Sequence, residues 1–315
     1  MRTFSRKSIG YIWWIGAASI LYLVPRFLDD AWISVITEIL ITALAASSLN
    51  LLVGNCGVVS FGHAGFFAVG AYSYSLMMYY NIGPFWVSFM GAIVFSGIFA
   101  LICGYFCVKM VEVYFALLAL AFSQIVSLVI YNWYDVTKGD DGLTGVPVPD
   151  WLQSIDNTYF FVLVVVFTCL LLMRMITLSS FGGAINALRE NKDRVMFIGV
   201  NPPKYLLIAF VLSGIFMGVA GGLMAIFMRS AFVSFASFVK SGDFLLACLL
   251  GGIFTFLGPP VGAAVYLFLD KIVTSYTEYW PMVLGLLLLI ITLFLPGGIC
   301  GFLEKRYGLM RSGDR

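Results

Sequence analysis

Long apolar stretches follow one another along almost the whole chain, with only short polar segments between them. A helix needs roughly 20 mostly apolar residues to cross the hydrocarbon core of a bilayer. The stretches 159–173 and 282–295 are continuously apolar, whereas the strands of a transmembrane β-barrel alternate in polarity over about ten residues. The pattern therefore predicts an all-α fold, a polytopic transmembrane helical bundle of about ten spans. The predicted spans are residues 9–25, 32–53, 63–80, 84–108, 112–133, 158–178, 204–228, 243–257, 259–277 and 280–297.

Composition excludes an ordinary soluble domain. Of the 315 residues, 61% are hydrophobic and 11% are charged, and the mean hydropathy is +1.00, far from the balance of a soluble globular chain. The net charge of +2 is too small to indicate nucleic-acid binding. Residues 1–25 have the basic start and apolar run of a signal peptide, but no cleavage pattern of small residues follows. We therefore expect a retained first span and a single transmembrane domain over residues 1–315.

The distribution of charge predicts how the chain is oriented. Basic residues gather before the first span, between the sixth and seventh spans, and after the last span. The positive-inside rule assigns these three regions to the cytoplasm, and ten spans with both termini cytoplasmic satisfy it. The loop 134–157 contains five aspartates and one lysine, and it is expected on the extracytoplasmic side.

Two apolar stretches are interrupted by small residues or proline. GNCGVVSFGHAG (54–65) interrupts the first half of the chain, and GGIFTFLGPPVGAA (251–264) interrupts the second. Interruptions in comparable positions of two halves indicate broken helices around a translocation pathway. We therefore expect broken helices and an internal inverted repeat.

The single histidine of the chain, His63, lies in the first interruption, within SFGHAG. One histidine cannot form a site that needs two histidine ligands, and no neighbouring acid orients the imidazole as a general base for Ser60. Two interpretations stay open: His63 hydrogen-bonds backbone groups freed by the chain break, or it faces the translocation pathway. For the polar residues inside apolar helices, hydrogen bonding between helices is the alternative to a pathway role. The candidate pathway residues are Asn50, Ser60, Gly62, His63 and Gln124.

The sequence lacks the motifs of the common enzyme classes. No lysine follows a glycine, so the chain is not expected to bind ATP through a phosphate-binding loop. No Gly-x-Ser-x-Gly elbow surrounds a serine, and the six cysteines lie in or beside apolar runs without the spacing of a zinc site. We expect no catalytic residue, no metal site and no cofactor bound by this chain.

Ionisable residues inside apolar spans are costly and are functional candidates by default. Glu38 lies in the second predicted span, and Asp270 and Lys271 lie in the ninth. As neighbours on a helix, Asp270 and Lys271 point about 100° apart, so each needs its own partner or an aqueous cavity. A structural ion pair and a contact with substrate are the two alternatives.

Residues 179–203 form a cytoplasmic segment of a different kind. A serine pair at its start is suited to cap a helix, and Phe181, Ile185 and Leu188 recur at helical spacing on one face. The helix is expected to end near Gly199, before two prolines. A short amphipathic helix of this kind lies on a membrane surface or docks into a partner's groove. Its mixed charge favours docking.

Several blocks of sequence occur in a definite order along the chain. They are LNLLVGNCGVVSFGHAGFFAVGAY (49–72), VYFALLALAFSQIV (113–126), KGDDGLTGVP (138–147), SFGGAINALRENKDRVMFIGV (180–200), AFVLSGIFMGVAGGLMA (209–225), LLGGIFTFLGPPVGAAVY (249–266) and FLPGGICGFL (294–303). Over about residues 35–303, the chain resembles the permease subunits of branched-chain amino acid ABC importers, the LivM-like family. Ordered blocks of this kind are more specific than any single glycine motif.

The resemblance implies a multi-pass subunit of the bacterial inner membrane, embedded in the lipid bilayer. The implied partners are a second homologous permease subunit, two ABC ATPase subunits and a periplasmic substrate-binding protein. The partner ATPase subunits use ATP and Mg, which fits the missing phosphate-binding loop of this chain. Residues 180–200 then correspond to the segment that couples the permease to its ATPases. The implied coupling residues are Phe181, Gly182, Arg189, Glu190, Asn191, Asp193 and Gly199.

The block GDDGLTG belongs to the extracytoplasmic loop. Asp140, Asp141 and Gly142 form a turn in an exposed loop, or they contact the binding protein or the outer gate. The chain departs from the family pattern at Glu112, where the family commonly has glycine, and at residues 55–56, where it often has tyrosine-threonine. The second departure leaves the class of substrate open.

Together these features predict a transport subunit that makes and breaks no bond in its substrate. The main hypothesis is a permease that moves a small polar substrate from a periplasmic binding protein into the cytoplasm. That substrate is a branched-chain or other amino acid, or a related amide or carboxylate. The alternative is an ion-coupled secondary transporter with Glu38, Asp270 and His63 as coupling sites. The pore partner is either a second copy of this chain or a different chain.

Overall fold

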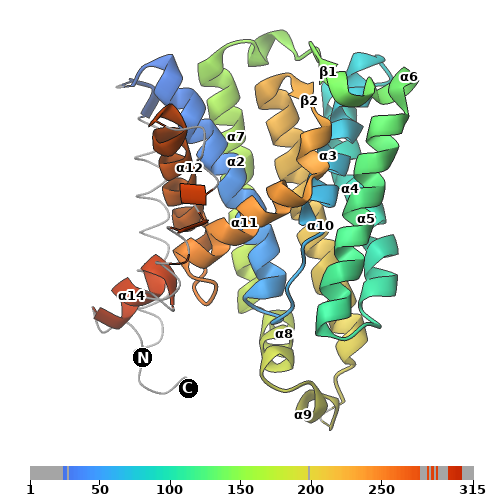
Figure 1. The fold of residues 1–315 in the computed structure, drawn as a ribbon, viewed down its shortest axis with the longest axis vertical. Helices are drawn as coiled ribbons and strands as arrows, with labels where there is room; N and C mark the ends of the chain where they lie inside the picture. Colours follow the sequence, from blue (N-terminus) through green and yellow to red (C-terminus); the bar gives the residue numbers. More distant parts are fainter. Residues whose placement is uncertain are drawn as a thin grey trace.

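Figure 1 shows a bundle of helices in a computed structural model that describes residues 24–26, 28–197, 199–276, 282–283, 285–286, 289 and 297–306. The predicted all-α transmembrane bundle is confirmed, because five of the described helices are long and apolar enough to cross a membrane. The first and last predicted spans, 9–25 and 280–297, lie almost entirely outside the described residues. The total of ten spans therefore stays a prediction.

The described elements follow the chain as helices joined by short connections. The helices are α2 (Asp30–Val53), α3 (His63–Tyr79), α4 (Phe85–Cys107), α5 (Glu112–Asn132), α6 (Tyr134–Thr137), α7 (Ile155–Leu178), α8 (Ser180–Glu190), α9 (Lys192–Phe197), α10 (Pro202–Met228), α11 (Phe238–Gly251), α12 (Gly258–Tyr276) and α14 (Gly298–Arg306). The short elements are η1 (Val24–Arg26), η2 (Gly139–Asp141), η3 (Asp150–Leu152), η4 (Val233–Ala236), β1 (Leu143–Thr144) and β2 (Ser230–Ala231). We call the end of the bundle with α6 and β1 the upper end, and the end with α8 and α9 the lower end (Figure 1).

The predicted span 243–257 is wrong in its bounds, because α11 begins earlier, at Phe238, and ends earlier, at Gly251. The Oγ of Ser237 accepts a hydrogen bond from the N–H of Lys240 and caps the first turn of the helix. Because this first turn contains polar residues, the hydropathy pattern does not include it in an apolar span. The chain leaves the helix at a glycine with a φ of 112°, a conformation that favours this residue. With 14 residues, α11 is about 21 Å long, shorter than the hydrocarbon core of about 30 Å.

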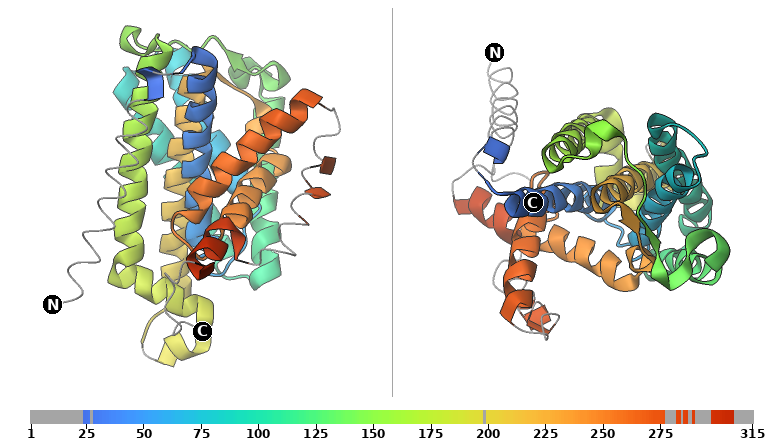
Figure 2. Two further views of the ribbon diagram at one scale, coloured as in Figure 1. Left: turned by 90° about the vertical axis from the view of Figure 1, so that its left-hand side faces the viewer. Right: turned by 90° about the horizontal axis from the view of Figure 1, so that it is seen from above.

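The centre of the bundle is α10, which packs against α2, α3 and α4 (Figure 2). Glycines allow α10 to approach α3 closely. A Cβ at Gly221 would overlap the carbonyl oxygen of Phe67, and a Cβ at Gly70 would overlap the backbone of Gly218. Small residues of this kind let helix backbones pack together where lipid supplies no hydrophobic drive for association.

The chain between α2 and α3 is not helical, as expected of a broken helix. From near the lower end, residues 54–62 run back up the bundle, and α3 begins about halfway along it (Figure 1). A turn at Gly57, whose φ is 71°, starts this return. The second interruption, residues 252–257, follows α11, and its Ile253 carbonyl would overlap a Cβ at Gly54. The two interrupted segments therefore meet, whereas the inverted repeat stays a prediction.

The segment 179–203 contains two short helices, α8 and α9. The sequence predicted a single helix that ends near Gly199. The predicted cap is confirmed, because the Oγ of Ser179 accepts a hydrogen bond from the N–H of Gly182 (3.4 Å). Asn191 then leaves α8 in an extended conformation, and its Oδ1 accepts a hydrogen bond from the N–H of Arg194 (2.9 Å). Asparagine competes with the helix for backbone groups in this way, and this competition divides the segment into α8 and α9.

The apolar face predicted for α8 is confirmed. Ile185 and Leu188 are buried, and the ring of Phe181 stacks on Tyr205 of α10 with 5.7 Å between centroids. This face holds α8 against the lower ends of α7 and α10.

The loop 134–157 is ordered by a two-stranded antiparallel sheet. Leu143 of β1 lies opposite Ala231 of β2, and the N–H of Val146 donates a hydrogen bond to the carbonyl of Arg229 (2.9 Å). The loop is therefore attached to the upper end of α10.

Candidate functional site

A closed cavity lies near the lower end, where α2 and α7 meet the start of α12. It is lined by Ser47, Asn50, Leu51, Asn55, Met173, Thr177, Phe256 and Pro259. The Oδ1 of Asn50 and the Oγ of Ser47 are buried without a hydrogen-bond partner among the described residues. The cavity volume is about 10 Å³, enough for about one water molecule. The cavity therefore has no room for a larger solute in the structure.

Arg189 of α8 joins the coupling segment to both interrupted segments. Its guanidinium donates a hydrogen bond to the carbonyl of Gly54 and lies over the ring of Phe254, with 5.1 Å from Cζ to the ring centroid. Its Cγ also lies close to Gly57, where a Cβ would overlap the arginine side chain. The planar guanidinium supports hydrogen bonding and stacking together. Arg189 therefore contacts both interruptions directly.

Most of the other implied coupling residues lie on the outside of the lower end. The exposed ones are Glu190, Asn191, Asp193 and Gly199. Sequence reasoning missed Phe197, whose side chain is 89% exposed at the end of α9. An apolar ring within a charged hexapeptide was the available signal, because exposed apolar side chains gather at interaction surfaces.

His63 is wholly buried, and both of its ring nitrogens have hydroxyl partners. Nδ1 lies 2.9 Å from the Oγ of Ser60, and Nε2 lies 2.8 Å from the Oγ of Ser213 in α10. Because Ser213 donates its own hydrogen to the carbonyl of Ser48, it accepts a hydrogen bond from Nε2–H, and Nδ1 accepts one from Ser60. The imidazole thus joins the broken segment to α10, and through Ser213 to α2, by hydroxyl groups.

The start of α3 is also held by backbone contacts. A Cβ at Gly62 would overlap the carbonyl of Ala119 in α5, and the N–H of Ala64 donates to the Oγ of Ser241 in α11 (3.0 Å). Close approach of α3 to α5 at this level therefore requires glycine.

The structure does not bring the five candidate pathway residues into one cavity. Asn50 lines the lower cavity, whereas Ser60, Gly62 and His63 belong to the buried contacts at the start of α3. Gln124 lies on α5 with its side chain partly exposed. The role of these residues in transport stays a prediction.

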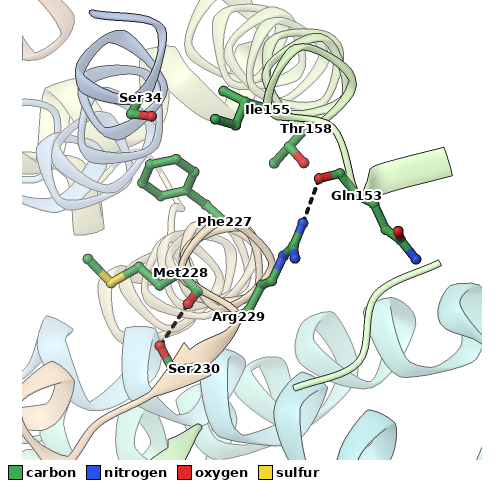
Figure 3. A pocket seen from close by; sticks show the side chains of 8 residues that line it. All are labelled: Ser34, Gln153, Ile155, Thr158, Phe227, Met228, Arg229 and Ser230. Carbon is green, nitrogen blue, oxygen red and sulfur yellow. Dashed lines mark hydrogen bonds between the residues drawn. The ribbon is translucent and has the colours of Figure 1, made fainter. Parts of the chain in front are cut away.

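A larger cavity of about 700 Å³ lies at the upper end, between α2, α7 and α10 (Figure 3). It is lined by Ser34, Gln153, Ile155, Thr158, Phe227, Met228, Arg229 and Ser230. The guanidinium of Arg229 extends into this space and donates a hydrogen bond to the carbonyl of Gln153 (2.7 Å). Sequence reasoning missed Arg229, because a single basic residue after an apolar span resembles an ordinary helix end.

Two of the charged residues within the helices, Lys271 and Asp243, have partners of opposite charge. The Nζ of Lys271 in α12 lies 3.0 Å from the Oε2 of Glu38 in α2, so the predicted structural ion pair is confirmed for Lys271. In α11, Asp243 accepts a hydrogen bond from the hydroxyl of Tyr266 (2.6 Å) and lies 3.9 Å from the Nζ of Lys240. These contacts hold α12 against α2 and α11.

The acidic pair of the upper loop is exposed. The Oη of Tyr134 donates a hydrogen bond to Asp141 (2.8 Å), and this bond to the carboxylate raises the pKa of Tyr134 above its ordinary value. Gly142 has a φ of 70°, and a Cβ there would overlap Phe232. The turn interpretation of Asp140, Asp141 and Gly142 is therefore consistent with the backbone.

Metal-binding clusters are absent from the part of the chain that the structure describes, where no group of three histidine, cysteine, aspartate or glutamate side chains is placed to hold an ion. Five of the described cysteines, Cys56, Cys103, Cys107, Cys169 and Cys248, are buried.

Comparison with known proteins finds relatives over most of the chain. A family model described as "Branched-chain amino acid transport system / permease component" matches residues 31–292. The high-affinity branched-chain amino acid transport system permease protein LivM of Salmonella typhimurium is 26% identical over 305 residues, covering 87% of this chain and 71% of LivM. LivM of Escherichia coli is 25% identical over the same shares. The permease protein LivH of Escherichia coli is 25% identical over 282 residues, covering 82% of this chain and 91% of LivH. No solved structure matches significantly.

Proposed function

We propose that this chain, which belongs to the family of branched-chain amino acid transport system permease components, forms part of the membrane pathway of an ATP-powered importer. Its substrate is a branched-chain amino acid or a close analogue. Relatives of two kinds, LivM and LivH, are named as permeases of a high-affinity branched-chain amino acid system, and both kinds align with most of this chain.

The proposed complex contains a second permease subunit, two ATPase subunits and a periplasmic binding protein in the bacterial inner membrane. The lower end, with α8 and α9, faces the cytoplasm, and both termini lie on that side. Basic residues between α7 and α10 support this orientation through the positive-inside rule. ATP and Mg belong to the ATPase subunits, since this chain has no phosphate-binding loop.

One observation supports the ATP-powered mechanism above the others: α8 and α9 project from the lower end as a separate coupling surface (Figure 1). The side chains of Met196 and Phe197 are 52% and 89% exposed there, beside exposed residues of both charges such as Glu190 and Arg194. Apolar side chains surrounded by mixed charge suit a protein groove better than a lipid surface.

Inside the subunit, Arg189 transmits the movement. A push on α8 displaces Arg189, which is bonded to Gly54 and stacked on Phe254. Both residues flank the closed cavity at Asn50, since Gly54 follows Asn50 by one helical turn and Phe254 precedes the cavity residue Phe256. Opening this cavity gives the substrate a way to the lower end.

Reconstitution in liposomes tests the proposal. In vesicles whose outer surface carries the upper end, the complete complex with its binding protein outside is expected to take up labelled leucine only when ATP is enclosed in the lumen, at the lower end. Complexes without ATPase subunits are the control. Leucine uptake by this chain alone, driven by a proton or sodium gradient, would contradict the proposal and favour the ion-coupled alternative.

A further inference from the structure

We propose that the upper cavity binds the carboxylate of an apolar amino acid, with Arg229 as the anion-binding residue. This inference rests on the proposed function, because it assigns a site on the permease to the substrate class of the importer. It follows from the backbone at Arg229, the charge of the cavity wall, its apolar side and its position in the bundle.

The backbone holds Arg229 in an unusual conformation. Its φ of 50° and ψ of 33° place it in the left-handed region at the end of α10, where glycine avoids the steric penalty of a side chain. The carbonyl of Arg229 is fixed by the N–H of Val146, which sets the direction of the side chain. A long basic side chain in a strained position of this kind is typical of functional sites.

Arg229 supplies the uncompensated charge of the cavity. The lining residues that the structure describes include no acidic residue, and none of the described carboxylates forms an ion pair with Arg229. One of its five N–H groups has a partner within the described chain, the Gln153 carbonyl. The hydroxyls of Ser34, Thr158 and Ser230 each donate to a backbone carbonyl. The guanidinium is therefore the donor available to an anion, and its fork matches a carboxylate.

The opposite side of the cavity is apolar. Phe227 and Ile155 both line the cavity and lie across from Arg229 in Figure 3. A charged donor facing an apolar wall suits a ligand with a carboxylate at one end and an aliphatic side chain at the other. The volume of about 700 Å³ lies within the usual range of about 300–1,000 Å³ for small-molecule sites.

The position of the cavity fits an entrance. Helices α2 and α7 contribute residues to both the upper cavity and the closed lower cavity. The two cavities therefore lie at opposite ends of the interface between these helices, which we call the α2–α7 seam. Along α2, Ser34 at the top and Asn50 at the bottom are about 24 Å apart at 1.5 Å per residue. A ligand held by Arg229 is thus placed at the upper end of the α2–α7 seam, whose lower end Asn50 closes.

Cysteine protection tests the site without depending on transport. Ser34→Cys places a thiol in the wall, and a small cationic methanethiosulfonate labels it in the purified permease. Leucine is expected to slow this labelling, and leucinamide, which lacks the carboxylate, is expected to leave it unchanged. Arg229→Gln in the Ser34→Cys background is expected to weaken leucine protection about tenfold, because a hydrogen bond to a charged group is lost. The wild-type chain, whose described cysteines are mostly buried, measures background labelling.

A matched control distinguishes loss of the binding site from a general effect of removing an arginine. Arg26→Gln removes an exposed arginine at the same end of the bundle, and protection by leucine is expected to persist. Ile155→Cys serves as the reporter if Ser34→Cys does not fold. Equal protection by leucinamide, or undiminished protection in Arg229→Gln, would overturn the inference.

The same preparation distinguishes the two proposals. If the complete complex imports leucine with ATP while leucine gives no protection at Ser34→Cys, the cavity inference fails and the proposed function stands. If ATP-dependent import is absent, the proposed function itself fails.

Discussion

At the scale of the residue, His63 stays at the centre of the bundle because each ring nitrogen has a hydroxyl partner. Its bonds to Ser60 and Ser213 satisfy polar groups that would otherwise be buried without partners, which costs about 1–3 kcal/mol per group. The imidazole acts as a link between α10 and a segment that has no helix of its own. These contacts favour the first interpretation, in which His63 stabilises the broken segment.

Replacing Ser213 tests this role. Ser213→Ala leaves Nε2–H of His63 and the carbonyl of Ser48 without their partner, and it is expected to lower the free energy of unfolding by about 1–3 kcal/mol. His63→Ala is expected to cost at least as much, because it also leaves a cavity. Thermal unfolding of the purified protein in detergent measures both. Ser275→Ala, which removes an exposed hydroxyl, is the control. Normal stability of His63→Ala with loss of uptake would instead favour a side chain that faces the pathway.

At the scale of the element, α8 combines two functions on two sides. Its buried side, with Ile185 and Leu188, fixes it to the bundle, while Arg189 extends inward to Gly54. Its neighbour Glu190 is exposed. Arg189 is exposed as well, so its bond to Gly54, rather than burial, distinguishes it from Glu190. We therefore expect Arg189 to transmit movement within the subunit and Glu190 to contact the ATPase.

Paired substitutions distinguish these functions. Arg189→Ala is expected to reduce ATP-dependent uptake by about tenfold, since it removes a charge-assisted hydrogen bond, while the ATPase subunits still co-purify and hydrolyse ATP. Glu190→Ala is expected to weaken co-purification of the ATPases, with the internal contacts intact. Loss of co-purification in Arg189→Ala, or normal uptake in that variant, would remove Arg189 from the proposed transmission.

At the scale of the whole molecule, the two cavities differ in size at opposite ends of the route that we propose for the substrate. The upper cavity is large and the lower one holds about one water molecule. The α2–α7 seam is therefore open at the top and closed at Asn50. A transporter that exposes its pathway alternately must reverse this relation during its cycle.

A thiol at the closed cavity reports this reversal. Asn50→Cys is expected to react slowly with a small charged reagent in the isolated permease, because the cavity excludes it. Labelling is expected to rise when the complex turns over ATP. Ile82→Cys, in the connection between α3 and α4 where Ile82 is 67% exposed, is expected to react equally in both conditions. Rapid labelling of Asn50→Cys without ATPase subunits would show that the lower cavity is not the closed gate.

The sequence by itself determined the class of the protein and most of its helices. Apolar runs must be helical in a bilayer, where every backbone group needs an internal partner, so α2, α4, α5, α7 and α10 follow from hydropathy alone. Local rules determined the cap at Ser179 and the apolar face of α8, since both depend on neighbours within one helical turn. Ordered sequence blocks determined the family for the same reason: they need no knowledge of contacts.

Only the tertiary structure decided which distant groups meet. His63 and Ser213 are 150 residues apart, and Arg189 and Gly54 are 135 apart, so no local pattern pairs them. The upper cavity requires three helix ends and the left-handed backbone at Arg229. Local sequence patterns predict individual helices but not the contacts between them. Close packing of small residues and the partners of buried polar groups are properties of the assembled bundle.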